Sequence, residues 1–122
     1  WVVVVLMQAM LVGSAWFAGE TGHDEEERVE KVVKESYIEA HEEAADLVFW
    51  IAAAGLAAAL VGLAEGNLGA WGRAGALVIS LAALAASVQT GRLGGELVYH
   101  HGAANAYIDQ PPSAPPAEAH EH

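Results

Sequence analysis

The sequence predicts an all-α integral membrane protein, and three observations lead to this fold class. The chain has 122 residues, enough for one compact unit, and 54% of them are apolar. Three stretches carry no charged side chain: residues 1–19, 47–64 and 74–91. A helix of that length spans about 27–29 Å, close to the ~30 Å hydrocarbon core of a bilayer. A soluble bundle would instead place polar residues at every third or fourth position.

The first apolar stretch, residues 1–19, is expected to be a membrane span. It lacks the basic region that opens a secretory signal, and the chain does not begin with methionine. We therefore expect that a helix upstream of Trp1 is missing. The three predicted spans would then be part of a four-helix bundle.

The acidic segment 20–46 follows the first span and is expected to be helical. Val29, Val32, Val33 and Tyr37 recur at helical spacing and indicate one apolar stripe. Two interpretations are open. The segment is one long helix that enters the membrane near Asp46, or the chain turns somewhere before Glu35.

The remaining elements follow from glycine and proline. Residues 65–72 are expected to be a tight connection between the second and third spans. Gly94–Gly95 and Gly102 are expected to loosen or end the last helix. The helical membrane domain would cover residues 1–110, and the Pro- and Ala-rich tail 111–122 is expected to be disordered.

Charge and composition exclude several classes of function. The formal net charge is -11, which argues against nucleic acid as a partner. The chain has no cysteine, which excludes disulfides, thiolate zinc and cysteine-held iron–sulfur clusters. It has no G-x-S-x-G elbow and no phosphate-binding loop. Its spans lack the ionisable residues that a transporter usually carries.

The histidines converge on one side of the predicted membrane. All six histidines and fifteen of the sixteen acids lie on that side, and Glu65 is the exception. Along a helix, His23, His41 and His100 would lie within roughly 6–14 Å of the membrane edge. They could form one layer.

A histidine layer beside apolar helices suits b-type haem, because imidazole binds haem iron axially and needs no cysteine. We expect His41 and His101 to be the axial ligands, with His100 and His23 next. Arg92 would orient a haem propionate or pair with Glu96. Close helix packing is the first explanation of the small residues in the last two spans, and a planar group could use the same space.

Other interpretations stay open for the same residues. His41 could be a polar histidine at the membrane interface, and most of the acids a solvated face. Histidine with carboxylates also suits zinc, iron or manganese. The Glu-x-x-His motif of di-iron bundles is absent, however, because position 38 is Ile38.

The stretch from Gly91 to Gly102, GRLGGELVYHHG, resembles the C-terminal signature of the membrane-protein family called domain of unknown function 2231. In that pattern the histidine before the glycine corresponds to His101. Thr21–Gly22–His23 and His41–Ala45 are similar to the family's middle spans. The resemblance implies a small four-helix membrane unit of a kind suspected of binding haem. The family's opening His-Pro motif has no counterpart here.

We therefore expect a small membrane subunit that binds b-type haem and relays electrons within a respiratory or photosynthetic complex, rather than a stand-alone enzyme. Its electron partners would be quinol or a periplasmic cytochrome. The alternative is a non-catalytic accessory subunit that packs against a larger complex without a cofactor. We expect it in the lipid bilayer of the bacterial inner membrane. The acidic face is expected to be periplasmic, although the count of lysines and arginines favours the cytoplasm.

Overall fold

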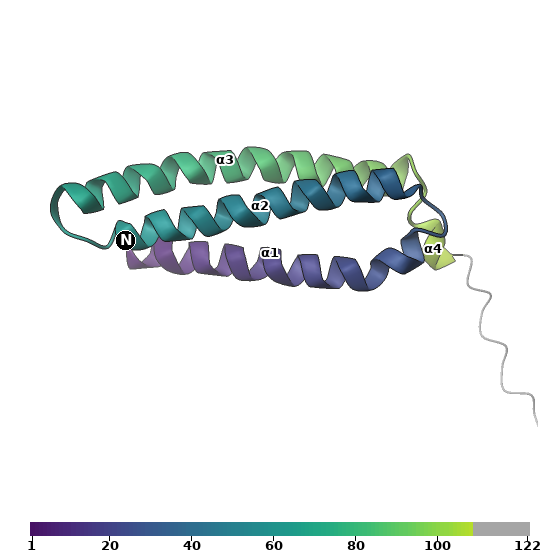
Figure 1. Cartoon of the computed structure of the whole chain (residues 1–122), viewed down its shortest axis with the longest axis horizontal. Coiled ribbons are helices and arrows are strands. Elements are labelled where there is room, and N and C mark those ends of the chain that lie inside the picture. Colours follow the sequence, from purple (N-terminus) through teal and green to yellow (C-terminus); the bar gives the residue numbers. More distant parts are fainter. Residues whose placement is uncertain (109–122) are drawn as a thin grey trace, which may run out of the picture.

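The computed structural model describes residues 1–108, and this part of the chain folds into four helices. They are α1 (Val2–Val29), α2 (Glu35–Val61), α3 (Gly66–Tyr99) and the single turn α4 (Asn105–Ile108). The three long helices lie side by side along the long axis of the molecule (Figure 1). Each is long and apolar enough to cross a membrane, which confirms the all-helical class and the three candidate spans. The predicted tail, with His120 and His122, lies outside the described residues.

The turn between α1 and α2 settles the two interpretations of the acidic segment. The first helix continues to Val29, the chain turns over residues 30–34, and the second helix begins at Glu35. Val33 and Ile38 are buried at this turn with Leu97 and Ala103, against a partly buried Val29. The apolar stripe of the acidic segment therefore folds back onto the end of α3 instead of following one straight helix.

The connection between α2 and α3 is shorter than expected. It covers residues 62–65, and the glycine-rich segment after it is the first part of α3. Glycine is required there because the two helices nearly touch. A Cβ atom at Gly72 would lie 2.5 Å from the backbone nitrogen of Gly62, and one at Gly69 would overlap the carbonyl of Ala64. The prediction of a loop over 65–72 was wrong because these glycines serve close packing.

The last helix also continues further than its glycines suggested. Gly94 and Gly95 lie inside α3, which ends at Tyr99. The prediction that they loosen the helix was wrong. Gly94 instead makes room for a side chain of α2, because a Cβ atom there would lie 3.0 Å from His41 Cε1. Gly102, in contrast, has a φ of +74° just beyond the helix, a conformation that favours glycine.

The interior of the structure is thin and built from small residues. The buried positions on α2 and α3 are mainly alanine and glycine, such as Ala52, Gly55, Ala59 and Ala76. Gln8 on α1 is buried too, and its Nε2 donates a hydrogen bond to Ser80 Oγ on α3 at 2.7 Å. Small side chains let the helices approach closely, and most large apolar side chains point outward.

Candidate functional site

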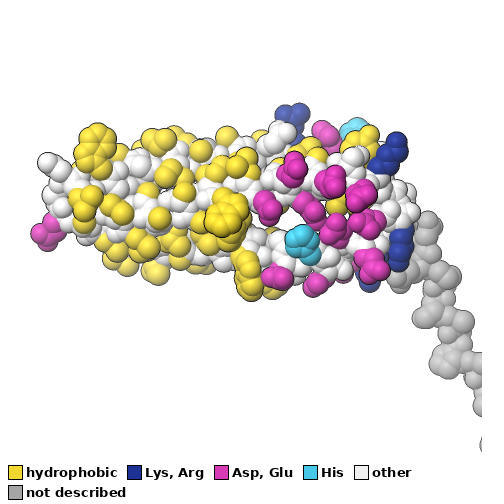
Figure 2. Space-filling model, in the orientation of Figure 1, with side chains coloured by type: hydrophobic (Ala, Val, Ile, Leu, Met, Phe, Trp, Pro, Cys, Tyr) yellow, Lys and Arg dark blue, Asp and Glu magenta, His cyan; other side chains and the backbone are white. Residues whose placement is uncertain are grey.

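The acidic side chains gather at one end of the helices, where α1 and α2 extend past their apolar stretches. Figure 2 shows acids, most of the basic residues and histidine over this end and apolar side chains over the rest of the visible face. At 1.5 Å per residue, the 28 residues of α1 span about 42 Å, more than a bilayer core requires. The surplus length of α1 and α2 forms this polar end, which we call the acidic end.

His41 lies on α2 and packs against the backbone of α3. A Cβ atom at Gly94 would come within 3.0 Å of His41 Cε1, so only glycine leaves the imidazole undisturbed. His41 Nδ1 is fully shielded from solvent and has no hydrogen-bond partner among the described residues. Buried polar atoms without a partner are costly and uncommon, so this nitrogen calls for an explanation.

The ring of His41 lines a groove of about 330 Å³, which we call the His41 groove. All three long helices contribute to it. Its lining is mostly small: Ala15, Ala18, Gly19, Gly22, Ala45, Ser87 and Thr90, with Val48, His41 and Glu42. The small side chains of α1 leave open space between the helices at the point where His41 lies.

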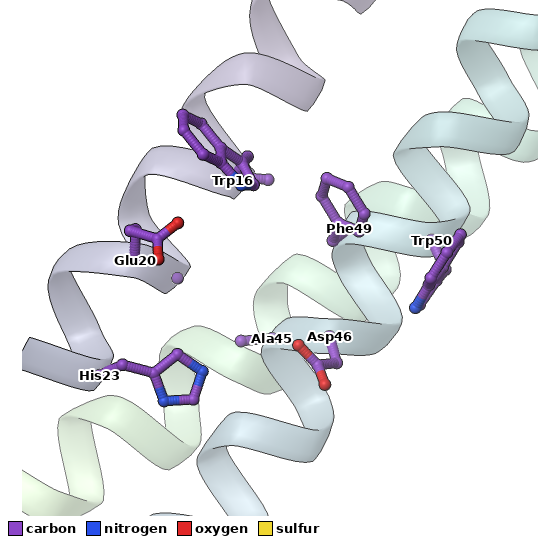
Figure 3. Close-up of a pocket in the computed structure, with 9 residues that line it drawn as sticks. Trp16, Glu20, His23, Ala45, Asp46, Phe49 and Trp50 are labelled. Carbon is purple, nitrogen blue, oxygen red and sulfur yellow. The ribbon is translucent and has the colours of Figure 1, made fainter. Parts of the chain in front are cut away.

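A second groove of about 400 Å³ lies between α1 and α2, and Figure 3 shows the residues around it. We call it the His23 groove. The His23 ring extends from α1 toward α2, and Trp16, Phe49 and Trp50 line the more apolar part. Ala15, Gly19 and Ala45 line both grooves, and a Cβ atom at Gly19 would meet nothing within 4 Å, so the two grooves adjoin at these small residues.

His23 is held among carboxylates from both helices. Its Nδ1 lies 3.4 Å from Glu26 Oε2 on α1 and 3.6 Å from Glu42 Oε1 on α2. The hydrogen bond to Glu26 and the charge of Glu42 raise the pKa of His23 above its usual value. Burial, and next the charge of Glu26, raise the pKa of Glu42. His23 and Glu42 therefore hold protons more tightly than isolated side chains would.

The other predicted ligands have different surroundings. His101 stacks on Tyr37 with ring centroids 3.8 Å apart and an interplanar angle of 17°. His100 is exposed at the end of α3 and does not line the His41 groove. Arg92 is exposed, and within residues 1–108 it forms no ion pair, including the one considered with Glu96. The structure thus places His23 and His41 in neighbouring grooves, whereas His101 stacks on Tyr37 and lines neither groove.

Sequence reasoning did not find the partners that define these sites. His41 of α2 contacts Gly94 of α3, and His23 of α1 contacts Glu42 of α2. Both contacts join separate helices, so spacing along the chain does not predict them. Tyr37 was recognised only as part of an apolar stripe, not as a stacking partner. The spacing of His23 and Glu26, three residues apart, was the one signal of the carboxylate cluster in the chain itself.

Comparison with known proteins adds no assignment, because no protein-family model, curated protein or solved structure matches this chain. The resemblance of the segment from Gly91 to Gly102 therefore stays an expectation.

Proposed function

We propose that this chain is a multi-pass membrane subunit that holds b-type haem in the His41 groove and relays electrons within a larger complex. The observation that carries the proposal is the position of His41, which is half-buried and whose Nδ1 is shielded from solvent. Its Nδ1 has no partner among the described residues, and it lines an open groove walled by small residues from three helices.

Membrane insertion is part of this proposal and rests on the exposed surface. Leu6, Met10, Leu77, Leu81 and Leu84 are each more than half exposed. Soluble monomers rarely expose such continuous apolar surface, whereas lipid chains solvate it without cost. The charge-free parts of α1, α2 and α3 would lie in the bilayer, and the acidic end would lie outside it. The bacterial inner membrane, with this end on the periplasmic side, remains our expected location.

Haem fits the residues of the groove in two respects. Imidazole is a common axial ligand of haem iron, and bound haem supplies one-electron redox chemistry. Alanine and glycine on α1 leave room for a flat ring, which bulkier side chains would fill. Arg92 does not line the groove: it lies on α3 two residues after the lining residue Thr90, and side chains two positions apart on a helix point about 200° apart. Its exposed guanidinium would therefore reach a propionate only outside the groove.

The second axial ligand is less well supported than the first. His101 stacks on Tyr37 and does not line the His41 groove. Stacking covers a face of the ring and not its nitrogens, so His101 is the weaker candidate because it lies outside the groove lining. We therefore assign His41 as the first ligand and keep His101 as the second, with His100 and His23 behind it.

The test is the haem content of purified variants, measured by pyridine haemochrome. We expect His41→Ala to lose most of the haem and His101→Ala to lose part of it. His122→Ala is the matched control, because it removes a histidine that is outside the proposed ligand set. Haem content unchanged in both His41→Ala and His101→Ala would overturn the assignment.

A second candidate function is an accessory subunit that packs against a larger complex without a cofactor. It is favoured by the small share of each helix that is buried within the chain, which leaves most apolar surface free for protein neighbours. Co-purification in equal amounts with larger subunits, together with a colourless isolated chain, would support this function over the first.

A further inference from the structure

We propose that His23, Glu26 and Glu42 form a divalent transition-metal site, of the kind that zinc occupies, which ties α1 to α2 at the acidic end. This site is separate from the proposed haem and does not depend on it. It rests on one juxtaposition: a ring nitrogen and two carboxylate oxygens from two helices, all within 4.8 Å of one another.

The distances already approach those of a coordination sphere. His23 Nδ1 lies 3.4 Å from Glu26 Oε2 and 3.6 Å from Glu42 Oε1. Two tetrahedral ligands with zinc bonds of about 2.0–2.2 Å lie about 3.4 Å apart. Only small side-chain rotations would be needed to place an ion among the three atoms. Imidazole with carboxylates is a donor set that suits zinc, iron or manganese.

The charges of the cluster also favour a cation. Glu26 and Glu42 face each other across the helix contact, and within residues 1–108 no lysine or arginine forms an ion pair with either. Arg28, the nearest base along α1, instead pairs with Glu25 at 3.0 Å. A divalent ion would supply the missing positive charge.

This cluster differs from a buried structural metal site in two ways: solvent reaches its side chains, and three protein ligands do not fill a tetrahedral coordination sphere. The His23 side chain is 65% exposed, and those of Glu26 and Glu42 are 30% and 33% exposed. Three protein ligands leave a fourth position to water, as in catalytic zinc sites. Glu42 also lines the His41 groove, so a bound ion would lie at the edge of that groove.

The experiment is a zinc titration of the full chain in detergent or nanodiscs, followed by competition with a chromophoric chelator. The background variant carries His120→Ala and His122→Ala, because tail histidines could also bind zinc. Magnesium chloride, a hard cation that prefers all-oxygen sites, is the control ion. Trp16 and Trp50 line the adjoining His23 groove, so their fluorescence gives a second readout.

We expect one zinc ion per chain, with little competition from magnesium. His23→Ala and Glu42→Gln should each weaken zinc binding about tenfold or more, since even residues that only support metal ligands contribute about 10–100-fold. Glu43→Gln is the matched control: it removes the same charge at the next position of α2. Circular dichroism would verify that each variant keeps its helices. Equal zinc affinity in Glu42→Gln and Glu43→Gln, or equal binding of magnesium, would overturn the site and leave only an acidic surface.

Discussion

The imidazole of His41 lies against Gly94 so closely that a methyl group there would come within 3.0 Å of its Cε1 atom. One residue later, Gly95 has open space where its side chain would be. The two adjacent glycines of α3 therefore have different roles. The first receives a histidine from α2, and the second has no packing requirement.

This difference predicts different stabilities for two alanine substitutions. Alanine favours a helix interior over glycine by about 0.5–1 kcal/mol, so Gly95→Ala should leave the chain equally or more stable. Gly94→Ala should lose this gain, because the His41 ring must shift by a few tenths of an ångström. Gly94→Leu should displace the ring and lower haem content. Thermal unfolding in detergent and pyridine haemochrome would measure both effects. Identical behaviour of Gly94→Ala and Gly95→Ala would contradict the contact.

The hydrogen bond from Gln8 to Ser80 joins α1 to α3 within their apolar parts. A double-mutant cycle with Gln8→Ala and Ser80→Ala should give a coupling energy of about 0.6 kcal/mol, with about 1.7 kcal/mol as the upper limit for such bonds in membranes. Unfolding in mixed detergent micelles would measure it. Gln89→Ala is the control, because this side chain is exposed on α3. A coupling of zero would show that the two side chains do not act together.

The glycines at the start of α3 predict a stronger effect at the opposite end of the molecule. Gly72→Ala would place a Cβ atom 2.5 Å from the backbone nitrogen of Gly62, and a backbone atom cannot rotate away. We expect a loss of stability of about 1–3 kcal/mol, typical of overpacking. Gly91→Ala, at a position with free space, should be neutral or stabilising. Equal unfolding midpoints for the two variants would argue against the close helix contact.

The cluster at His23 predicts a dependence of stability on pH. The folded-state pKa values of His23 and Glu42 are both raised, so the folded chain holds these protons more tightly than the unfolded chain. Their contribution is complete below the usual values, 6.5 for histidine and 4.5 for glutamate, and is lost as the pH rises through the raised values. The helix contact at the acidic end should therefore weaken from pH 4 to pH 8 in the absence of metal.

Unfolding midpoints measured across this pH range would test the dependence. Glu42→Gln should reduce the pH dependence, because the amide does not titrate and no longer attracts the His23 proton, and the part due to the hydrogen bond between His23 and Glu26 should remain. Glu43→Gln should keep the profile of the unmodified chain. A stability that instead increases with pH between 4 and 8 would contradict the assigned signs.

The sequence was sufficient for the three long helices because charge-free stretches of 18 or 19 residues have few alternatives. It was misleading at Gly69, Gly72 and Gly94, because glycine disfavours an isolated helix but also permits close contact between packed helices. Whether a glycine ends a helix or allows another helix to pack closely against it depends on residues far along the chain.

The pairing of His23 with Glu42 was hidden for a related reason. In one continuous helix, these residues would lie 19 positions and about 28 Å apart. The turn over residues 30–34 brings them together, and both courses of the acidic segment were open from the sequence. The stack of His101 on Tyr37 likewise depends on how α3 ends against the start of α2.

The central claim is that the His41 groove holds haem, and the most direct test is a dithionite-reduced minus oxidised absorption spectrum. The sample would be the full chain, purified in detergent from cells supplied with haem precursor. We predict a sharp α-band of b-type haem, strongly reduced in His41→Ala and retained in His122→Ala, which removes a histidine outside the proposed ligand set. A flat spectrum in the unmodified chain, with its helices intact by circular dichroism, would contradict the claim and favour an accessory subunit without a cofactor.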